Sequence, residues 1–332
     1  MNIAQIEKKN ALRFIEISKP TPMEDEVLIE VMASGICGTD VHIYQGDYKG
    51  SYPIIPGHEF SGIIQEVGDK VRNFKIGDRV TIEPNLSCGT CYDCLSNRQH
   101  FCQNVQSVGV TKPGGMAQYV CVPERAVFPI GDLSFEEAAF MEPLSCVLHG
   151  VEQVNPGLSD SLLIIGAGPI GLLLLQSFLV KGCSRVDVID KDESRLKMAT
   201  AMGASSISTQ LDVNKKESYH IVCDATGVTF IMEETLNYVR PSGRILWFAV
   251  PHVDAEIKVH PFKMFEKEIS IFSSYTSCRN SWQALEMIQN KRINVSKLIS
   301  HRIPLKDFEK GLKILQNHSE PAMKILVLPQ ED

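Results

Sequence analysis

The sequence predicts an α/β protein in which a barrel-like β domain is joined to a domain built on a parallel sheet. Short β-prone runs separated by turn residues fill roughly the first 145 positions, as is typical of a small barrel. From Ser161 onward, strand-like and helix-like segments alternate, which indicates parallel strands joined by crossover helices. The chain has 332 residues, enough for two domains.

Each domain is expected from particular segments. In the first, strands are expected at four apolar runs bounded by Pro, Gly or Asp: Glu26–Ala33, Gly62–Val67, Arg79–Glu83 and Ala117–Val122. In the second, strands are expected at 161–165, 185–190, 220–224, 244–248 and 269–272, with helices at 170–182 and 194–202. The chain has no internal repeat and no low-complexity segment.

Composition argues against several classes of partner. The formal net charge of −7 and the pI of about 5.8 predict no basic surface for nucleic acid or for an anionic membrane. The first residues lack the pattern of a secretory signal, so a cytoplasmic location is expected. The uncharged run 161–180 is long enough for a membrane span, but its β-branched start and its Gly-Ala-Gly-Pro turn argue against one.

Four cysteines lie within fifteen residues, at Cys88, Cys91, Cys94 and Cys102. In a reducing compartment, thiols with such spacing more often hold a metal than form disulfides. Four thiolates can close a tetrahedron around zinc, and because no position stays open, the ion would be structural. The alternative is a set of unrelated or redox-active thiols. Five other cysteines lie in apolar contexts and need no function: Cys121, Cys146, Cys183, Cys223 and Cys278.

A second candidate metal site lies at Cys37 and His58, within the stretches 35–42 and 55–62. Thiol and imidazole groups suit zinc, and a catalytic zinc takes three protein ligands and leaves one position open. Thr39 and His42 would then act as hydroxyl and imidazole relays beside the ion. The alternative is that Cys37 and His58 are ordinary core residues.

Glu142 follows the apolar run 138–141 and precedes Pro143, which indicates the start of a helix. A carboxylate in such a setting either has a partner or interacts with the helix dipole. The sequence leaves both readings open.

A glycine-rich turn, Gly166-Ala167-Gly168-Pro169-Ile170-Gly171, follows a predicted strand and opens a predicted helix. Gly166 would make the tight turn, Gly168 would admit a pyrophosphate and Gly171 would allow the helix to pack on the strand. The alternative is a glycine turn in an unrelated α/β domain. The acid that ends the next predicted strand, Asp190, favours a dinucleotide site.

Asp190 ends the next predicted strand, 19 residues after Gly171, where an acid would bind the adenosine ribose hydroxyls. A carboxylate at that place would repel the 2′-phosphate of NADP, so NAD is the predicted cofactor. Lys191 and Arg195 lie close by in sequence and could instead accept a phosphate.

These motifs resemble the zinc-dependent medium-chain dehydrogenase/reductase family, and most closely its polyol (sorbitol-type) branch. The matching segments come from both domains: Cys37–His42, Gly57–Glu59, the four cysteines from 88 to 102, Ala138–Ser145, the glycine turn and Leu298–Leu305. The resemblance implies a GroES-like β-barrel catalytic domain at 1–146 and 278–332, with the tail from Ile293 returning to it. It also implies a doubly wound Rossmann NAD-binding domain at 147–277, with metal, substrate and nicotinamide in the cleft between the domains.

The resemblance also implies roles for single residues. Cys37, His58 and Glu59 would hold a catalytic zinc, and Glu142 would bind the zinc or the water on it. The alcohol-dehydrogenase branch has Cys at the Glu142 position, which favours the polyol branch. The implied reaction is reversible, NAD-linked oxidation of a secondary alcohol of a polyol to the ketose. Thr39 would take the hydroxyl proton and pass it through the nicotinamide ribose to His42.

The substrate pocket departs from the sorbitol-type pattern. Relatives commonly carry Arg-Tyr before Asn-Thr-Trp, whereas this chain has Ser277-Cys278 before Arg279-Asn280-Ser281-Trp282. Tyr44 and Glu142 are candidate pocket residues. A free polyol, a vicinal diol and a sugar-alcohol phosphate all remain open, while threonine is disfavoured because the segment after Phe272 differs from that branch.

Other classes also remain open. A zinc-free reductase is disfavoured by the cysteines, and a catalytically silent binding protein is disfavoured by Thr39, His42 and Glu142 together. By analogy with relatives, a homodimer or homotetramer is expected.

Overall fold

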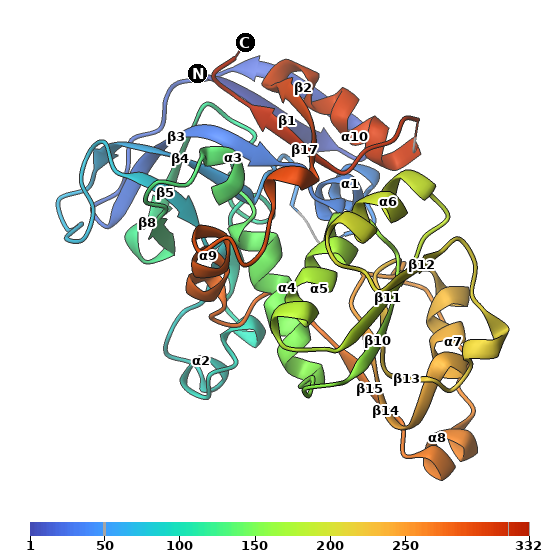
Figure 1. Cartoon of the computed structure of the whole chain (residues 1–332). Coiled ribbons are helices and arrows are strands. Elements are labelled where there is room, and N and C mark those ends of the chain that lie inside the picture. The colour runs from blue at the N-terminus through green and yellow to red at the C-terminus, as the bar shows by residue number, and fades with distance from the viewer. Residues whose placement is uncertain (49–50, 318, 332) are drawn as a thin grey trace. The chain divides into compact units, whose positions relative to one another are not determined.

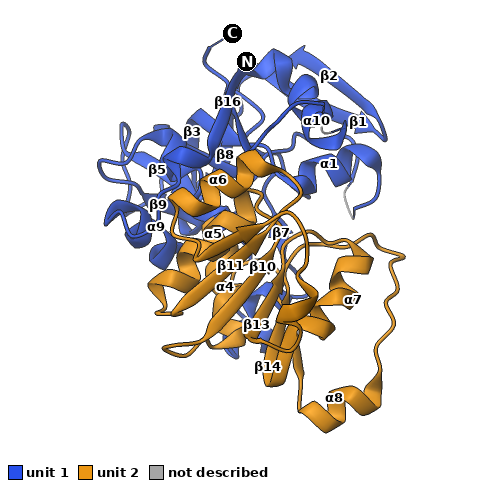
Figure 2. Ribbon diagram, turned by 45° about the vertical axis from the view of Figure 1, so that its right-hand side comes forward, with its two compact units in different colours: residues 1–143, 281–332 blue, residues 144–280 orange. Residues whose placement is uncertain are grey.

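The computed structural model describes residues 1–48, 51–317 and 319–331, and the chain forms two compact units (Figures 1 and 2). Unit 1 comprises Met1–Pro143 and Ser281–Asp332, and unit 2 comprises Leu144–Asn280. The chain passes from unit 1 to unit 2 after Pro143, three residues before the boundary expected at 146. It returns to unit 1 after Asn280, three residues after the boundary expected at 277. Helix α4 (Met141–Val154) carries the chain across the first boundary.

Unit 1 is built on a mainly antiparallel seven-stranded sheet. Its strand order is β16-β17-β3-β4-β5-β9, with β8 also paired to β3. The bounds are β3 (Glu26–Gly35), β4 (Glu59–Val67), β5 (Arg79–Ile82), β8 (Tyr119–Pro123), β9 (Val127–Pro129), β16 (Ile299–Pro304) and β17 (Lys324–Leu328). All four strands predicted for this domain are present, so the β domain expected over the first part of the chain is confirmed.

The C-terminal tail completes this sheet. Strand β17 pairs with the end of β3, where Leu326 lies opposite Gly35. On its other side, β3 pairs with β4, so that Gly35 also lies opposite Glu59. Three segments that are far apart in sequence therefore meet at the carboxyl end of β3.

Smaller elements surround the sheet of unit 1. Two two-stranded antiparallel sheets, β1 (Asn2–Lys8) with β2 (Ala11–Glu16) and β6 (Asn85–Leu86) with β7 (Gln106–Ser107), were not expected from the sequence. The helices are α1 (Gly38–Gln45), α2 (Tyr92–Leu95), α3 (Phe135–Ala138), α9 (Ser281–Gln289) and α10 (Phe308–Asn317).

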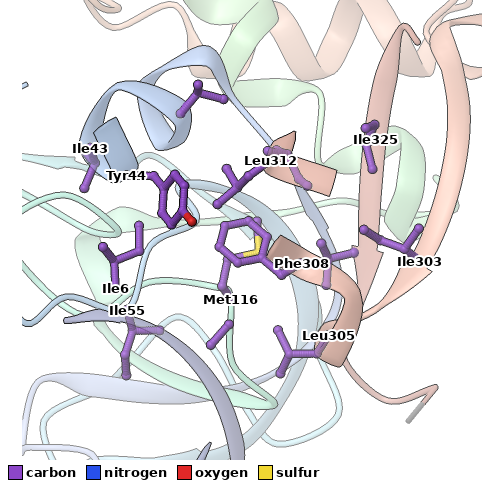
Figure 3. Packing of buried hydrophobic residues seen from close by; sticks show 14 of the residues in the cluster. Ile6, Ile43, Tyr44, Ile55, Met116, Ile303, Leu305, Phe308, Leu312 and Ile325 are labelled. Atoms are coloured by element: carbon purple, nitrogen blue, oxygen red, sulfur yellow. The ribbon is translucent and has the colours of Figure 1, made fainter. Parts of the chain in front are cut away.

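Helix α1 is fixed by a hydrophobic cluster that joins it to β1 and α10. Figure 3 shows Ile43 and Tyr44 of α1 beside Ile6, Phe308 and Leu312. All five side chains are buried, and Phe308 is fully buried. Because α1 begins directly after Cys37, this packing also fixes the position of the candidate metal site.

Unit 2 is a six-stranded parallel sheet with the order β12-β11-β10-β13-β14-β15. Its strands are β10 (Ser161–Ile165), β11 (Arg185–Ile189), β12 (Ser206–Ser208), β13 (Tyr219–Asp224), β14 (Val239–Trp247) and β15 (Ser270–Ser273). Its other helices are α5 (Pro169–Val180), α6 (Glu193–Ala201), α7 (Thr229–Tyr238) and α8 (Pro261–Lys267). This order is that of the Rossmann fold and confirms the predicted fold class.

The strand order of unit 2 reverses between β10 and β13, and ligands of open α/β sheets bind at such a point. Ile165 at the end of β10 lies opposite both Ile189 and Asp224, so the loops after β10, β11 and β13 emerge together. The apolar run 161–180 is divided between β10 and α5, and none of the helices described is long and apolar enough to cross a membrane.

Candidate metal centres and cofactor site

The ligand atoms of Cys37, His58 and Glu59 all lie within 4.8 Å of one another. Cys37 follows β3 and precedes α1, while Glu59 is the first residue of β4. Gly35 makes this convergence possible, because a Cβ at that position would lie 2.2 Å from Glu59 Oε2. The sequence prediction of three zinc donors at this place is therefore consistent with their geometry.

Asp40 organises the cluster from the first turn of α1. Its carboxylate accepts hydrogen bonds from the backbone N–H of Cys37 at 2.8 Å and of Gly57 at 3.3 Å. It also faces Nδ1 of His58 at 3.6 Å, a distance beyond hydrogen-bond length. A carboxylate behind the imidazole is typical of metal-binding histidines, because it orients the ring toward the ion.

Lys324 is a member of this site that the sequence analysis missed. Its Nζ donates to Glu59 at 2.8 and 2.5 Å and to the Ile36 carbonyl at 3.3 Å. The two side chains are only 7% and 2% exposed. A single Lys at the head of the apolar run 324–328 is a signal that could have found it, because a lysine is rarely buried without a partner.

The charges of this cluster favour a cation. Burial raises the pKa of Asp40. For His58, burial acts to lower the pKa, but the charges of Asp40 and Cys37 outweigh it and raise the pKa well above its usual value. The pKa of Lys324 is also raised, because Glu59 and Cys37 outweigh the effect of burial. Thiol, imidazole and carboxylate donors in such a field fit a zinc ion.

Glu142 is the second residue of α4 and is buried. Its charge acts on both His58 and Lys324, so it lies near the cluster. Its carboxylate is not part of the group of three donors that lie within 4.8 Å among the residues described. Direct binding of a metal by Glu142 therefore stays a prediction.

Three predicted residues lie on α1. Thr39 and His42 are half-buried and three positions apart, which places them on one face of the helix. Their relay role stays a prediction. The substrate contact of Tyr44 also stays a prediction; its hydroxyl donates to Glu309 of α10 at 3.0 Å and its ring packs in the cluster of Figure 3.

The segment 277–282, where this chain departs from the sorbitol-type substrate motif, contains the second boundary between the units. Arg279 is exposed and has φ +61°, a backbone conformation unusual for arginine. The Asn280 side chain donates to Glu152 of α4 at 3.1 Å. The structure thus gives Asn280 an anchoring role and leaves the substrate contacts undetermined.

The four cysteines from 88 to 102 also converge, with all sulfurs within 4.8 Å. The sulfur of Cys94 lies 3.9 Å from that of Cys88 and 3.5 Å from that of Cys91. Four sulfurs at tetrahedral positions around zinc would lie ~3.8 Å apart, because each Zn–S bond is about 2.3 Å. Backbone and hydroxyl donors of Thr90 help lower the pKa of Cys88 to about 5, which favours the thiolate that zinc needs.

The glycine turn of unit 2 has the features that a dinucleotide site requires. Gly166 has φ +106°, and a Cβ on Gly171 would lie 1.9 Å from the Gly166 carbonyl oxygen. Gly168 is the N-cap of α5, and a Cβ added to it would have no atom of the described residues within 4 Å. Pro169 and Ile170 form the first turn of that helix, whose N–H groups would attract phosphate.

Asp190 binds the glycine turn directly. It accepts hydrogen bonds from the N–H of Ala167 at 2.7 Å and of Asp192 at 2.9 Å. Arg195 lies near it, with Nη1 4.0 Å from Asp190 Oδ2. The predicted residues at 166–171, 190 and 195 are therefore brought together at the carboxyl ends of β10 and β11.

A second loop of this site was missed. Asp224 ends β13 and accepts hydrogen bonds from the N–H groups of Thr226 and Gly227, both at 3.0 Å. A Cβ on Gly166 would lie 3.1 Å from the Ala225 carbonyl oxygen, so this loop forms a wall of the glycine turn. The signal was available, since Asp224 ends a predicted strand and is followed by Ala225, Thr226 and Gly227.

Comparisons with known proteins agree with this geometry. Residues 23–132 match the model of the alcohol dehydrogenase GroES-like domain, and residues 169–290 match that of the zinc-binding dehydrogenase. The chain is 36% identical to D-altritol 5-dehydrogenase of Agrobacterium fabrum over 90% of its length and 93% of that protein. It is 32% identical to D-arabinitol dehydrogenase 1 of Uromyces fabae over 99% of its length and 97% of that protein.

Among solved structures, a protein from Sinorhizobium meliloti 1021, described as a zinc-binding dehydrogenase bound to NADP, superposes with a TM-score of 0.93. It is 28% identical and the match covers 99% of both chains.

Proposed function

The chain belongs to the zinc-dependent medium-chain dehydrogenase/reductase family, and on this premise we propose that it reversibly oxidises a secondary alcohol of a polyol to the ketose with NAD. The observation that carries the proposal is the convergence of Cys37, His58 and Glu59 within 4.8 Å in a chain that also has a dinucleotide-type glycine turn. The names of the altritol and arabinitol dehydrogenases support the substrate class.

The residues of unit 1 have separate tasks in this proposal. Cys37, His58 and Glu59 would hold the catalytic zinc, and the buried carboxylate of Glu142 would add a donor beside it. When bound, zinc supplies Lewis acidity that makes an alcohol hydroxyl easier to deprotonate. Thr39 would accept the alcohol proton as its own hydroxyl releases one, and His42, one helical turn away, would pass the released proton to solvent.

Unit 2 supplies the redox partner. A nicotinamide cofactor bound there would supply the hydride acceptor. The first turn of α5 holds the pyrophosphate, and Asp190 accepts hydrogen bonds from the adenosine ribose. We assign NAD rather than NADP because the carboxylate of Asp190 would repel a 2′-phosphate; Arg195 is the residue that could oppose this preference.

The cysteines at 88, 91, 94 and 102 hold a second, structural zinc in this proposal. Zinc-binding thiols of this kind fit a reducing compartment, so the cytoplasm is the proposed location.

We also propose a homodimer or homotetramer. Strand β15 is an edge of the unit 2 sheet, and on neighbouring α8 the side chains of Phe262 and Phe265 are 62% and 79% exposed. Exposed apolar residues beside a free sheet edge are typical of an interface. Light scattering coupled to gel filtration tests the proposal, and a monomer at micromolar concentration would contradict it.

A substrate screen tests the central proposal. The purified protein should contain two zinc ions per chain and should reduce NAD in the presence of one or more free polyols from a panel of altritol, arabinitol, sorbitol and xylitol. The panel also includes vicinal diols, polyol phosphates and threonine, each with NAD and with NADP. Exclusive turnover of a phosphate, a diol or threonine would replace the substrate class. Tight NADH binding without any turnover would favour a catalytically silent binding protein.

A further inference from the structure

The turn between β11 and α6 holds a cation between two acids. Arg195 lies on the first turn of α6, with Nη1 4.0 Å from Asp190 Oδ2 and Nε 3.6 Å from Asp192 Oδ2. Only 26% of the Arg195 side chain is exposed, compared with 8% for Asp190 and 31% for Asp192. The guanidinium therefore faces both carboxylates at the place where the ribose of a dinucleotide would lie.

Asp192 divides its two oxygens between two tasks. Oδ1 caps α6 by accepting hydrogen bonds from Ser194 N–H at 2.8 Å, from the Ser194 hydroxyl at 2.6 Å and from Arg195 N–H at 3.4 Å. Oδ2 faces the Arg195 guanidinium. The helix cap thus fixes the carboxylate in the position from which it pairs with Arg195.

An arginine at this place has a consequence for cofactor choice. Guanidinium groups bind phosphate through paired hydrogen bonds, so a free Arg195 would attract the 2′-phosphate of NADP. Pairing with two carboxylates neutralises that attraction. Lys191, in the same turn, is exposed and offers a second cation to the phosphate.

We propose that Asp192 is a specificity-determining residue that withholds Arg195 from a 2′-phosphate and so favours NAD over NADP. The inference rests on the proposed function, because it requires a nicotinamide dinucleotide in unit 2. Two acids then discriminate in different ways: Asp190 binds the free ribose hydroxyls, and Asp192 acts through Arg195.

The substitution Asp192→Asn tests this inference. Asn is as good an N-cap as Asp, so α6 is retained while the charge is lost. Dissociation constants for NADH and NADPH are measured by fluorescence titration of the full-length, zinc-containing protein without substrate. We expect NADPH to bind up to about fivefold tighter and NADH to change less than about twofold, since a partly exposed ion pair contributes up to about 1 kcal/mol. The gain should shrink at high ionic strength.

Glu193→Gln is the matched control, because it removes the same charge from the next, exposed position of the turn. An equal gain in NADPH affinity in this control would show that the effect comes from net charge alone, and it would overturn the inference. In an Arg195→Gln background, Asp192→Asn should give no gain, and a persistent gain would overturn an action through Arg195. If the wild type binds neither nucleotide, the proposed function itself fails. If it binds them and Asp192→Asn leaves their ratio unchanged, only this inference fails.

Discussion

Replacing Lys324 by Met should destabilise unit 1 strongly, because it leaves the Glu59 carboxylate buried without its cation. The Lys324 Nζ lies 2.8 and 2.5 Å from the two oxygens, and the side chains are 7% and 2% exposed, so solvent screens the pair little. Removing one partner of such a pair costs about 3–5 kcal/mol. We expect the unfolding free energy of the metal-free protein to fall by about that amount.

The two tryptophans make the assay specific. Trp282 lies in unit 1 and Trp247 in unit 2, so a Trp247→Phe parent reports the urea unfolding of unit 1 by fluorescence. Lys324→Arg keeps the charge and should cost much less. Adding Glu59→Gln to Lys324→Met should recover most of the lost stability, because no lone charge remains. Equal urea midpoints for Lys324→Met and the parent would refute this reasoning.

Three further predictions concern the metal sites, the glycine turn and a buried acid. Cys37→Ser should abolish turnover but preserve NADH binding, whereas Cys91→Ser should lose the other zinc and unfold at lower temperature; full activity in both would contradict the two zinc assignments. Gly168→Ala should keep the melting temperature and weaken NADH binding about tenfold or more, since only a bound ligand would occupy the space around the new Cβ. Gly171→Ala should also destabilise the fold, because its Cβ would lie 1.9 Å from the Gly166 carbonyl oxygen. Burial acts to raise the pKa of Asp187, but hydrogen bonds from its neighbours lower it to about 2. The Asp187 carboxylate therefore contributes about 2–3 kcal/mol to the free energy of unfolding above its unfolded pKa of about 3.9, and this contribution is lost as the pH falls toward 2. The urea midpoints of wild type and Asp187→Asn should converge over that pH range. Plots of midpoint against pH that stay parallel would contradict this.

The features that the sequence predicted are those set by short-range geometry. Gly166 and Gly171 were assigned from a six-residue motif, and their φ angle and close approach depend only on that turn. The four cysteines of the lobe formed by residues 88–102 were assigned in the same way, because their spacing alone allows the sulfurs to meet. The helix that Glu142 opens followed from the adjacent Pro143.

The features that were missed depend on contacts between distant segments. Lys324 pairs with Glu59, 265 positions earlier in the chain, and the Tyr44 hydroxyl binds Glu309 across the same separation. No local pattern fixes such a pairing, since it depends on the register of β17 on β3 and on the packing of α10 against α1. Tyr44 illustrates the same limit: as an aromatic residue near a metal motif it suggested a pocket contact, which stays a prediction, while its packing in the hydrophobic cluster could not be foreseen from the sequence.

The two candidate zinc sites of unit 1 differ in the hydrogen bonds and ion pairs that their donor atoms already make with other residues. In the 88–102 lobe, neutral donors such as the Thr90 hydroxyl, at 3.6 Å, face the Cys88 sulfur, so an ion there would not have to share it with a charged side chain. At the other site, the Glu59 oxygens are already bound by Lys324, and an ion there must share that carboxylate with a fixed cation. Of the three donors, Cys37 and His58 are not shared with Lys324, and we expect coordination that is incomplete and able to change. A site of this kind suits an exchanging substrate, whereas the lobe suits a permanent ion.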